Sequence, residues 1–245
     1  MREWEKLPKE LRNARVRKYY SLLKKKRMSL FIKRMLDLIF GVVLLVFFSP
    51  IFLILAVVIK IDSKGPVFYR QERVTIYNRT FKIFKFRTMV QNADKIGPLA
   101  TVENDKRVTR VGRIIRKVRL DEIPQLINII AGDMSFVGTR PEVRKYVDAY
   151  NDEMKATLLM RAGVTSYASI VFKDEDQIIK KYVNKNHDVD DVYVDKILPL
   201  KMQINLKYLR DFSVLTDFKI CVLTVISVLR PKKRIKTISG VKNEI

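Results

Sequence analysis

Cysteine and histidine are almost absent from this chain of 245 residues, which contains one of each. A single cysteine, Cys221, permits no internal disulfide and no cysteine-rich metal site. A lone histidine, His187, is too few for a histidine-based zinc site. Any chemistry must therefore rest on carboxylates, lysines and arginines, and a metal that took part would be a hard cation bound through oxygen.

Acidic residues are also scarce, with 26 Asp and Glu against 49 Lys and Arg, so the formal net charge is +23. Such an excess indicates an anionic partner, which could be nucleic acid or an acidic lipid surface. No helix-turn-helix, RRM or KH signature is visible, whereas a long apolar segment is present. We therefore expect anionic membrane lipids, and no nucleic acid, among the partners.

The apolar segment covers residues 38–59, LIFGVVLLVFFSPIFLILAVVI, which carry no charge and are long enough to cross a bilayer. Ser49-Pro50 lies near its centre, where the proline predicts a kink and the serine hydroxyl could bond a freed carbonyl. Basic residues flank both ends, which favours an entry and an exit on the cytoplasmic face. We predict a re-entrant membrane helix over residues 33–60, broken at Ser49-Pro50. A single span with a tolerated kink is the alternative.

The fold class expected for the rest is α+β and mostly helical. Residues 1–32 are predicted to be a basic amphipathic arm on the membrane surface, although a solvated helix or a disordered arm fits the same pattern. Residues 61–210 form a cytoplasmic domain, with strands near residues 67–69 and 80–89. Residues 211–245 are expected to form an interfacial helix and a basic tail.

Two adjacent acids, Asp121 and Glu122, stand where the pattern DEIPQLINIIAG predicts a helix start. Arginines precede and follow them, and helix N-termini attract anionic phosphate groups. Carboxylates among guanidinium groups suit phosphoryl transfer. Asp121 could equally be an ordinary helix cap, so residue types alone leave both interpretations open.

Longer motifs decide between these interpretations. KRMLDLIFG with the Ser-Pro break, GPVFYRQERV, KIFKFRTM and RVTRVGRIIRKVRLDEIPQLINIIAGDMSFVGTRPE follow one another between roughly residues 33 and 165. Together they resemble the bacterial sugar transferase family, the monotopic phosphoglycosyl transferases that act as polyprenyl-phosphate hexose-1-phosphate transferases. The chain departs from the family's common GPRP in reading Gly138-Thr139-Arg140-Pro141.

The resemblance implies a reaction, a place and a set of site residues. A sugar 1-phosphate would pass from a UDP-sugar to undecaprenyl phosphate with release of UMP, at the cytoplasmic face of the bacterial cell membrane, as a first step of surface polysaccharide assembly. Asp121 would be the covalent nucleophile, Glu122 would assist, and both would serve as ligands of the cofactor Mg²⁺. The residues implied in phosphate or substrate binding are Lys85, Arg87, Arg116, Arg119, Gln125 and Arg140.

The sequence and the resemblance leave three points undecided. A membrane-tethered protein that binds anionic lipid or nucleic acid without catalysis is the alternative function. The identity of the UDP-sugar is undetermined. A homodimer formed through the C-terminal helices is a further option.

Overall fold

The computed structural model describes residues 1–93, 105–173, 175 and 189–229, and these residues form a mostly helical α+β fold, as predicted. The predicted basic tail after residue 229 and His187 lie outside the described residues. The helices are α1 (Ala14–Lys25), α2 (Arg27–Asp62), α4 (Arg110–Lys117), α5 (Gln125–Ala131), α6 (Arg144–Asp148), α7 (Tyr167–Val171), α9 (Val189–Val192), α10 (Leu198–Asp211) and α11 (Val214–Leu229). Shorter helical turns are η1 (Trp4–Lys6), η2 (Lys9–Leu11), η3 (Ile76–Asn78), η4 (Leu120–Glu122), η5 (Met154–Leu159) and the π-helical η6 (Tyr193–Ile197).

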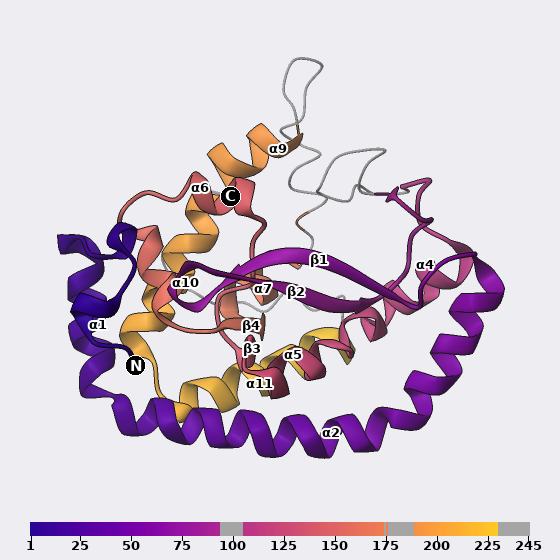
Figure 1. Cartoon of the computed structure of the whole chain (residues 1–245), viewed down its shortest axis with the longest axis horizontal. Coiled ribbons are helices and arrows are strands. Elements are labelled where there is room, and N and C mark those ends of the chain that lie inside the picture. The colour runs from indigo at the N-terminus through magenta and orange to yellow at the C-terminus, as the bar shows by residue number, and fades with distance from the viewer. Residues whose placement is uncertain (94–104, 174, 176–188, 230–245) are drawn as a thin grey trace.

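Helix α2 contains the long apolar segment and runs along the lower edge of the molecule before it turns upward at one end (Figure 1). The helix is continuous through Pro50, so the predicted break is not an interruption of the helix. Ser49 Oγ donates a hydrogen bond of 2.8 Å to the Val46 carbonyl. Since Val46 lies four residues before Pro50, this is the carbonyl that the proline deprives of its N–H donor. The predicted role of the serine hydroxyl is confirmed.

The N-terminal arm, predicted to lie on the membrane surface, packs into the protein body. Helix α1 exists, but Leu7, Leu11, Val16 and Leu23 are buried, and α1 contacts η5 and α10. These side chains join the main hydrophobic core, because burying them there removes more apolar surface from water than an isolated helix could. The arm still exposes its basic side chains and Leu22.

Two small sheets and helix α5 form the centre of the molecule. Strands β1 (Phe68–Thr75) and β2 (Arg79–Phe86) make an antiparallel hairpin in which Phe68 pairs with Phe86. Strands β3 (Met134–Val137) and β4 (Ala162–Thr165) pair in parallel. Helix α5 lies between α2 and β2, and its apolar residues share a core with those of β2 and β3. The turn that precedes α5 is thereby held at the end of the hairpin.

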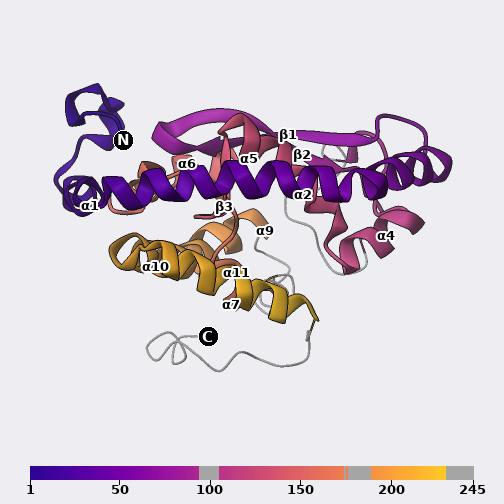
Figure 2. The same cartoon turned by 90° about the horizontal axis from the view of Figure 1, so that it is seen from below.

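Helices α2 and α11 lie side by side on the underside of the molecule (Figure 2). Buried polar bonds join them: Lys33 of α2 forms an ion pair with Asp217 of α11 and donates to the Val137 carbonyl at 2.8 Å. Tyr208 of α10 donates to Asp217 at 2.7 Å. Polar residues near the start of α2 thus attach this helix to the protein body.

Candidate active site

Asp121 and Glu122 lie in the 3₁₀ turn η4, between α4 and α5, and Asp121 does not cap a helix. The position before α5 is taken by Pro124, so the predicted capping role of Asp121 is wrong. Arg119 adopts a left-handed backbone with φ 59°, a conformation that usually selects glycine at the end of a helix. This residue turns the chain sharply after α4 and frees the two acids from a helical ladder.

Helix α4 is fixed closely against the chain that follows β2. The Thr109 hydroxyl accepts the Gly112 N–H at 3.0 Å and caps the helix. A Cβ at Gly112 would fall 2.0 Å from the Thr88 carbonyl oxygen, so only glycine fits there. Because α4 also contacts η4, this close approach sets where Arg116 stands relative to the acids.

Glu122 is the paired acid of the site. Its Oε1 accepts hydrogen bonds from Lys85 of β2 at 3.1 Å and from Arg140, which follows β3, at 2.7 Å. Burial alone would raise the pKa of Glu122, but the charges of Arg140 and Lys85 outweigh it and hold that pKa well below its ordinary value. Glu122 is therefore an ionised carboxylate that organises two cations.

Asp121 differs from Glu122 both in its hydrogen bonding and in the direction of its pKa shift. Its Oδ1 is buried and has no hydrogen-bond partner within the described residues. Burial raises the pKa of Asp121, and the positive charges of Lys85, Arg116 and Arg119 oppose the rise only in part, while the charge of Glu122 adds to it. A buried polar atom without a partner is uncommon in native proteins, and a catalytic role or a bound ion is one of the explanations for it.

Two more unpartnered groups belong to the same segments. The Gln125 side-chain amide nitrogen and the Thr139 hydroxyl are buried without a hydrogen-bond partner in the part of the chain that the structure describes. Gln125 follows the acids by one helical turn, and Thr139 adjoins Arg140. The site therefore offers an acceptor and two donors alongside its cations, which suits a phosphate ester.

The sequence prediction for Arg87 is not supported by its contacts. Its guanidinium donates to the Ser63 carbonyl at 2.7 Å and to the Lys64 carbonyl. Ser63 and Lys64 are the two residues that directly follow α2, where the chain leaves the helix. The contacts of Arg87 thus hold the chain at the end of α2, while its Nε is buried without a hydrogen-bond partner in the described part of the chain.

Arg73 is a site residue that the sequence prediction missed. Its guanidinium donates to the Pro141 carbonyl at 3.1 Å, and its positive charge acts on Lys85 and Arg140. Tyr69 pairs with Lys85 in the hairpin, and Arg73 lies four residues beyond Tyr69, on the same face. The alternation of β1 combined with this register would have pointed to Arg73.

A second buried hydrogen-bond network, centred on Glu142, acts on Arg73 and Arg140. Glu142 accepts from Tyr193 at 2.6 Å and from Lys201 at 3.4 Å, and Lys201 also donates to Tyr193 at 2.7 Å. Glu142 also attracts Arg73 and Arg140. Residues of η6 and α10 thus help to hold the cations that face Asp121 and Glu122, although they come late in the chain.

Of the two acids, Asp121 is better placed than Glu122 to be a ligand of Mg²⁺. No group of three or more Asp, Glu, His or Cys side chains placed to hold a metal occurs among the described residues. Protein sites for Mg²⁺ commonly use one or two carboxylates together with substrate phosphates and water. Asp121 Oδ1 is available for such a bond, whereas Glu122 Oε1 already accepts from two cations.

Comparison with known proteins gives the site its context. A family model described as bacterial sugar transferase matches residues 28–231, which include every residue of the site. The chain belongs to the bacterial sugar transferase family. This confirms the family indicated by the sequence motifs.

Curated members of the bacterial sugar transferase family show similarity over most of this chain. A UDP-N-acetylgalactosamine-undecaprenyl-phosphate N-acetylgalactosaminephosphotransferase of Aeromonas hydrophila is 38% identical over 81% of this chain and 44% of its own length. A UDP-glucose:undecaprenyl-phosphate glucose-1-phosphate transferase of Escherichia coli (strain K12) is 33% identical over 79% of this chain and 39% of its own length. A protein of Bacillus subtilis (strain 168) named uncharacterized sugar transferase EpsL is 33% identical over 81% of this chain and 87% of its own length. The chain thus spans less than half the length of the first two relatives.

Proposed function

We propose that this protein transfers a sugar 1-phosphate from a UDP-sugar to undecaprenyl phosphate and releases UMP. The names of the Aeromonas and Escherichia relatives describe this type of transfer, with N-acetylgalactosamine in one case and glucose in the other. The observation that carries the proposal is the contrast between the two adjacent acids. Glu122 Oε1 accepts from Lys85 and Arg140, while Asp121 Oδ1 is buried beside them without a hydrogen-bond partner among the described residues.

In the first step of the proposed reaction, an Asp121 carboxylate oxygen forms a bond to the β-phosphorus of the UDP-sugar. The bond from that phosphorus to the bridging oxygen breaks, and UMP leaves with the electron pair. A sugar phosphate is then held on Asp121 as an acyl phosphate. Attack by a carboxylate on a diphosphate brings like charges together, so the surrounding cations Lys85, Arg116, Arg119 and Arg140 are needed to offset them.

In the second step, a phosphate oxygen of undecaprenyl phosphate attacks the same phosphorus and the Asp121 carboxylate leaves. The product is undecaprenyl diphosphate sugar, and the protein returns to its starting state. A carboxylate with as low a pKa as Glu122 is a weak base, so we assign Glu122 the positioning of Lys85 and Arg140 in place of proton transfer. Bound Mg²⁺ would neutralise charge on the diphosphate, with Asp121 Oδ1 as the protein atom that fits it.

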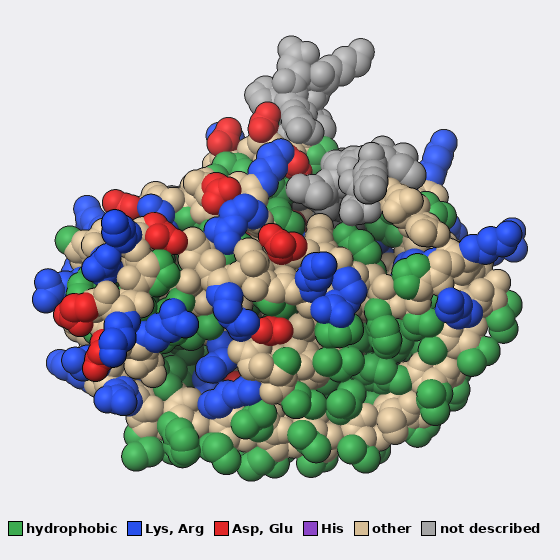
Figure 3. Space-filling model, viewed as in Figure 1, with side chains coloured by type: hydrophobic (Ala, Val, Ile, Leu, Met, Phe, Trp, Pro, Cys, Tyr) green, Lys and Arg blue, Asp and Glu red, His purple; other side chains and the backbone are tan. Residues whose placement is uncertain are grey.

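The lipid substrate requires a membrane, and we propose that the protein enters it from the cytoplasmic face without crossing. Helix α2 is long and apolar enough to reach across a bilayer. Hydrophobic side chains cover the lower edge of the molecule along α2 (Figure 3), and α11 exposes Leu215, Phe218 and Leu229 beside it. The bend of α2 and the basic residues at both of its ends support a re-entrant course.

The proposed covalent step can be tested by mass spectrometry of intact protein. Incubation with a panel of UDP-sugars, without lipid, should add one sugar phosphate to the peptide that contains Asp121 and release an equal amount of UMP. Asp121→Asn should abolish both, because the amide oxygen is a poor nucleophile. Asp148→Asn, at an exposed aspartate of α6, is the matched control and should retain both.

Three results would contradict this mechanism. An adduct that persists in Asp121→Asn would place the nucleophile elsewhere. UMP release by the wild type only when donor and lipid are both present would favour direct displacement. Absence of UMP release with every UDP-sugar and undecaprenyl phosphate would favour a membrane-tethered binding protein.

A further inference from the structure

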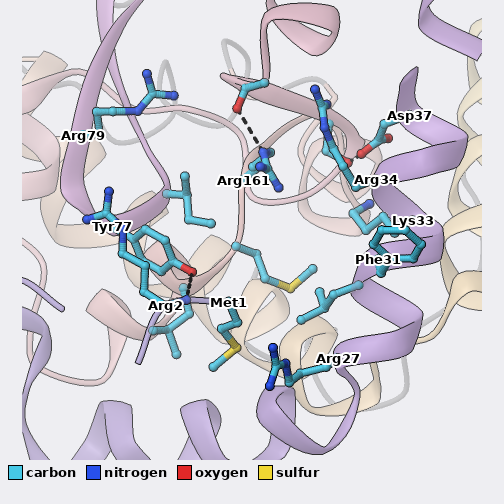
Figure 4. Close-up of a pocket in the computed structure, with 16 residues that line it drawn as sticks. Met1, Arg2, Arg27, Phe31, Lys33, Arg34, Asp37, Tyr77, Arg79 and Arg161 are labelled. Carbon is cyan, nitrogen blue, oxygen red and sulfur yellow. Dashed lines mark hydrogen bonds between the residues drawn. The ribbon is translucent and has the colours of Figure 1, made fainter. Parts of the chain in front are cut away.

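A cavity of about 820 Å³ lies away from the two acids. It is bounded by the start of α2, the turn of the hairpin and the chain after η5, and neither Asp121 nor Glu122 lines it. The acids precede α5 and Gly132 of the cavity wall follows it, so a helix about 10 Å long separates the two places. The charged residues that line the cavity are Arg2, Arg27, Lys33, Arg34, Asp37, Arg79 and Arg161 (Figure 4).

Part of this charge is already compensated. Lys33 pairs with Asp217, and Arg79 pairs with Asp133 at 2.7 Å. The carboxylate of Asp37 accepts from the Ser135 hydroxyl and from a backbone N–H, and its negative charge also acts on Arg34. The remaining cations of the cavity make no ion pair within the described residues, and the cavity carries a positive excess.

Arg34 and Arg161 are held in place by backbone carbonyls at the end of α5. Arg34 donates to the Ile129 carbonyl at 2.7 Å and to the Ile130 carbonyl at 3.1 Å, and Arg161 donates to the Gly132 carbonyl at 2.9 Å. Each guanidinium has five N–H donors, so both keep donors for a ligand. The two positive charges lie close enough to repel each other, and an anion between them would relieve that repulsion (Figure 4).

The side of the cavity opposite α2 is also built from fixed groups. The Arg2 backbone N–H donates to the Tyr77 hydroxyl at 2.9 Å, and the Arg2 guanidinium lies 4.9 Å from the centre of the Tyr77 ring. Tyr77 itself has a left-handed backbone with φ 57°. The hairpin turn and the N-terminal residues thus form a wall that faces the start of α2 (Figure 4).

The mouth of the cavity continues into exposed apolar surface. Phe31 lines the cavity and yet has 62% of its surface exposed. Met28, Met35 and Ile39 are also exposed, and their spacing places them with Phe31 along one side of α2. A ligand with an anionic head and an apolar tail matches this combination, whereas a free phosphate would leave the apolar side unused.

We propose that this cavity binds the phosphate headgroup of an anionic membrane phospholipid. Arg34 and Arg161 bind the phosphate, Arg27 lies at the mouth, and an acyl chain lies along Phe31. The proposal rests on the membrane placement of α2 given under the proposed function. Such a lipid would fix how deeply the start of α2 sits in the membrane.

The test is a titration of the full chain in detergent with dioleoylphosphatidylglycerol, followed by native mass spectrometry. We expect one molecule to bind more tightly than dioleoylphosphatidylcholine does. Arg34→Gln, Arg161→Gln and Arg27→Gln should each weaken binding, the first two by about tenfold or more. At positions 34 and 161, glutamine keeps an N–H donor for the carbonyls at the end of α5. Arg27 is exposed, so the Arg27→Gln variant should fold even if the other two do not. Arg15→Gln, an exposed arginine of α1, is the control of equal charge and should bind like the wild type.

A second arm uses glycerol 3-phosphate as a soluble source of the same phosphate. Phe31→Ser should weaken phosphatidylglycerol binding and leave glycerol 3-phosphate binding unchanged. Equal affinity for the two ligands, with no effect of Phe31→Ser, would overturn the lipid assignment in favour of a free phosphate. If Arg15→Gln weakens phosphatidylglycerol binding as much as the cavity variants do, the binding is general charge attraction and the cavity assignment is overturned. UMP release by the same samples reports the proposed transfer independently, because the titration requires no turnover.

Discussion

Of two nearly isosteric substitutions at neighbouring positions, Glu122→Gln should lower stability and Asp121→Asn should not. In Glu122→Gln, a neutral amide replaces the carboxylate whose Oε1 accepts from Lys85 at 3.1 Å and Arg140 at 2.7 Å. Breaking a buried ion pair by removing one partner costs about 3–5 kcal/mol. The side chains of Glu122, Lys85 and Arg140 are 13%, 20% and 34% exposed, and glutamine keeps an acceptor oxygen. Solvent screening at Arg140 and the retained acceptor reduce the expected loss to about 2 kcal/mol.

Asp121→Asn should leave the free energy of unfolding unchanged or raise it by about 1 kcal/mol. The Asp121 Oδ1 atom is buried without a partner in the described part of the chain, so removing its charge removes a desolvation cost. For a chain of this size, the loss at Glu122 corresponds to a melting temperature lower by roughly 4–8 °C. At Asp121, the negative charge that the proposed reaction needs lowers stability. At Glu122, the negative charge that positions Lys85 and Arg140 also raises stability.

The pH dependence separates the two acids further. The pKa of Glu122 is depressed in the folded protein, so its stabilising contribution is present above the unfolded value of 4.5 and is lost as pH falls through the folded pKa. The pKa of Asp121 is raised above 3.8, so its cost is present at neutral pH and disappears as pH falls towards 3.8. Both variants should approach wild-type stability in acid.

Thermal unfolding of the detergent-solubilised proteins, followed by circular dichroism at neutral and acidic pH, measures these differences. Asp148→Asn and other exposed sites should stay within about 0.5 kcal/mol of the wild type. An Asp121→Asn protein that is destabilised as much as Glu122→Gln would refute the assignment of paired and unpaired acids. A Glu122→Gln protein as stable as the wild type would do the same.

Three further outcomes are expected. In a Cys221→Ser background, cysteines placed at the exposed positions Lys25 and Lys64 should both react with a reagent confined to the cytoplasmic side, and labelling from opposite sides would contradict the re-entrant course. UMP release should require Mg²⁺, so undiminished turnover in excess EDTA would exclude the cofactor. Gly112→Ala should destabilise the protein by about 1–3 kcal/mol and lower activity, because its Cβ would lie 2.0 Å from the Thr88 carbonyl oxygen and displace α4. Gly41→Ala, whose nearest neighbour would be a side-chain atom at 3.3 Å, is the control and should change stability far less.

The elements that depend on local pattern could be predicted from the sequence. An uninterrupted apolar run dictates helix α2, and the loss of one N–H at Pro50 dictates that the Val46 carbonyl needs another donor, which Ser49 supplies. Alternation of apolar and polar residues likewise predicts strand β2. The order of family motifs around Asp121 predicts the chemistry, because that order is itself a property of the sequence.

Only the tertiary structure decided which partner each charged group meets. Periodicity places a side chain on a face but does not say what lies opposite, so Arg87 was expected at the acids and instead holds the end of α2. Arg73 entered the site only through the hairpin register. The contrast between Glu122, which meets two cations, and Asp121, whose Oδ1 meets none among the described residues, depends on segments far apart in the chain. Burial and charge pairing are properties of that assembly, and they determine how each acid ionises.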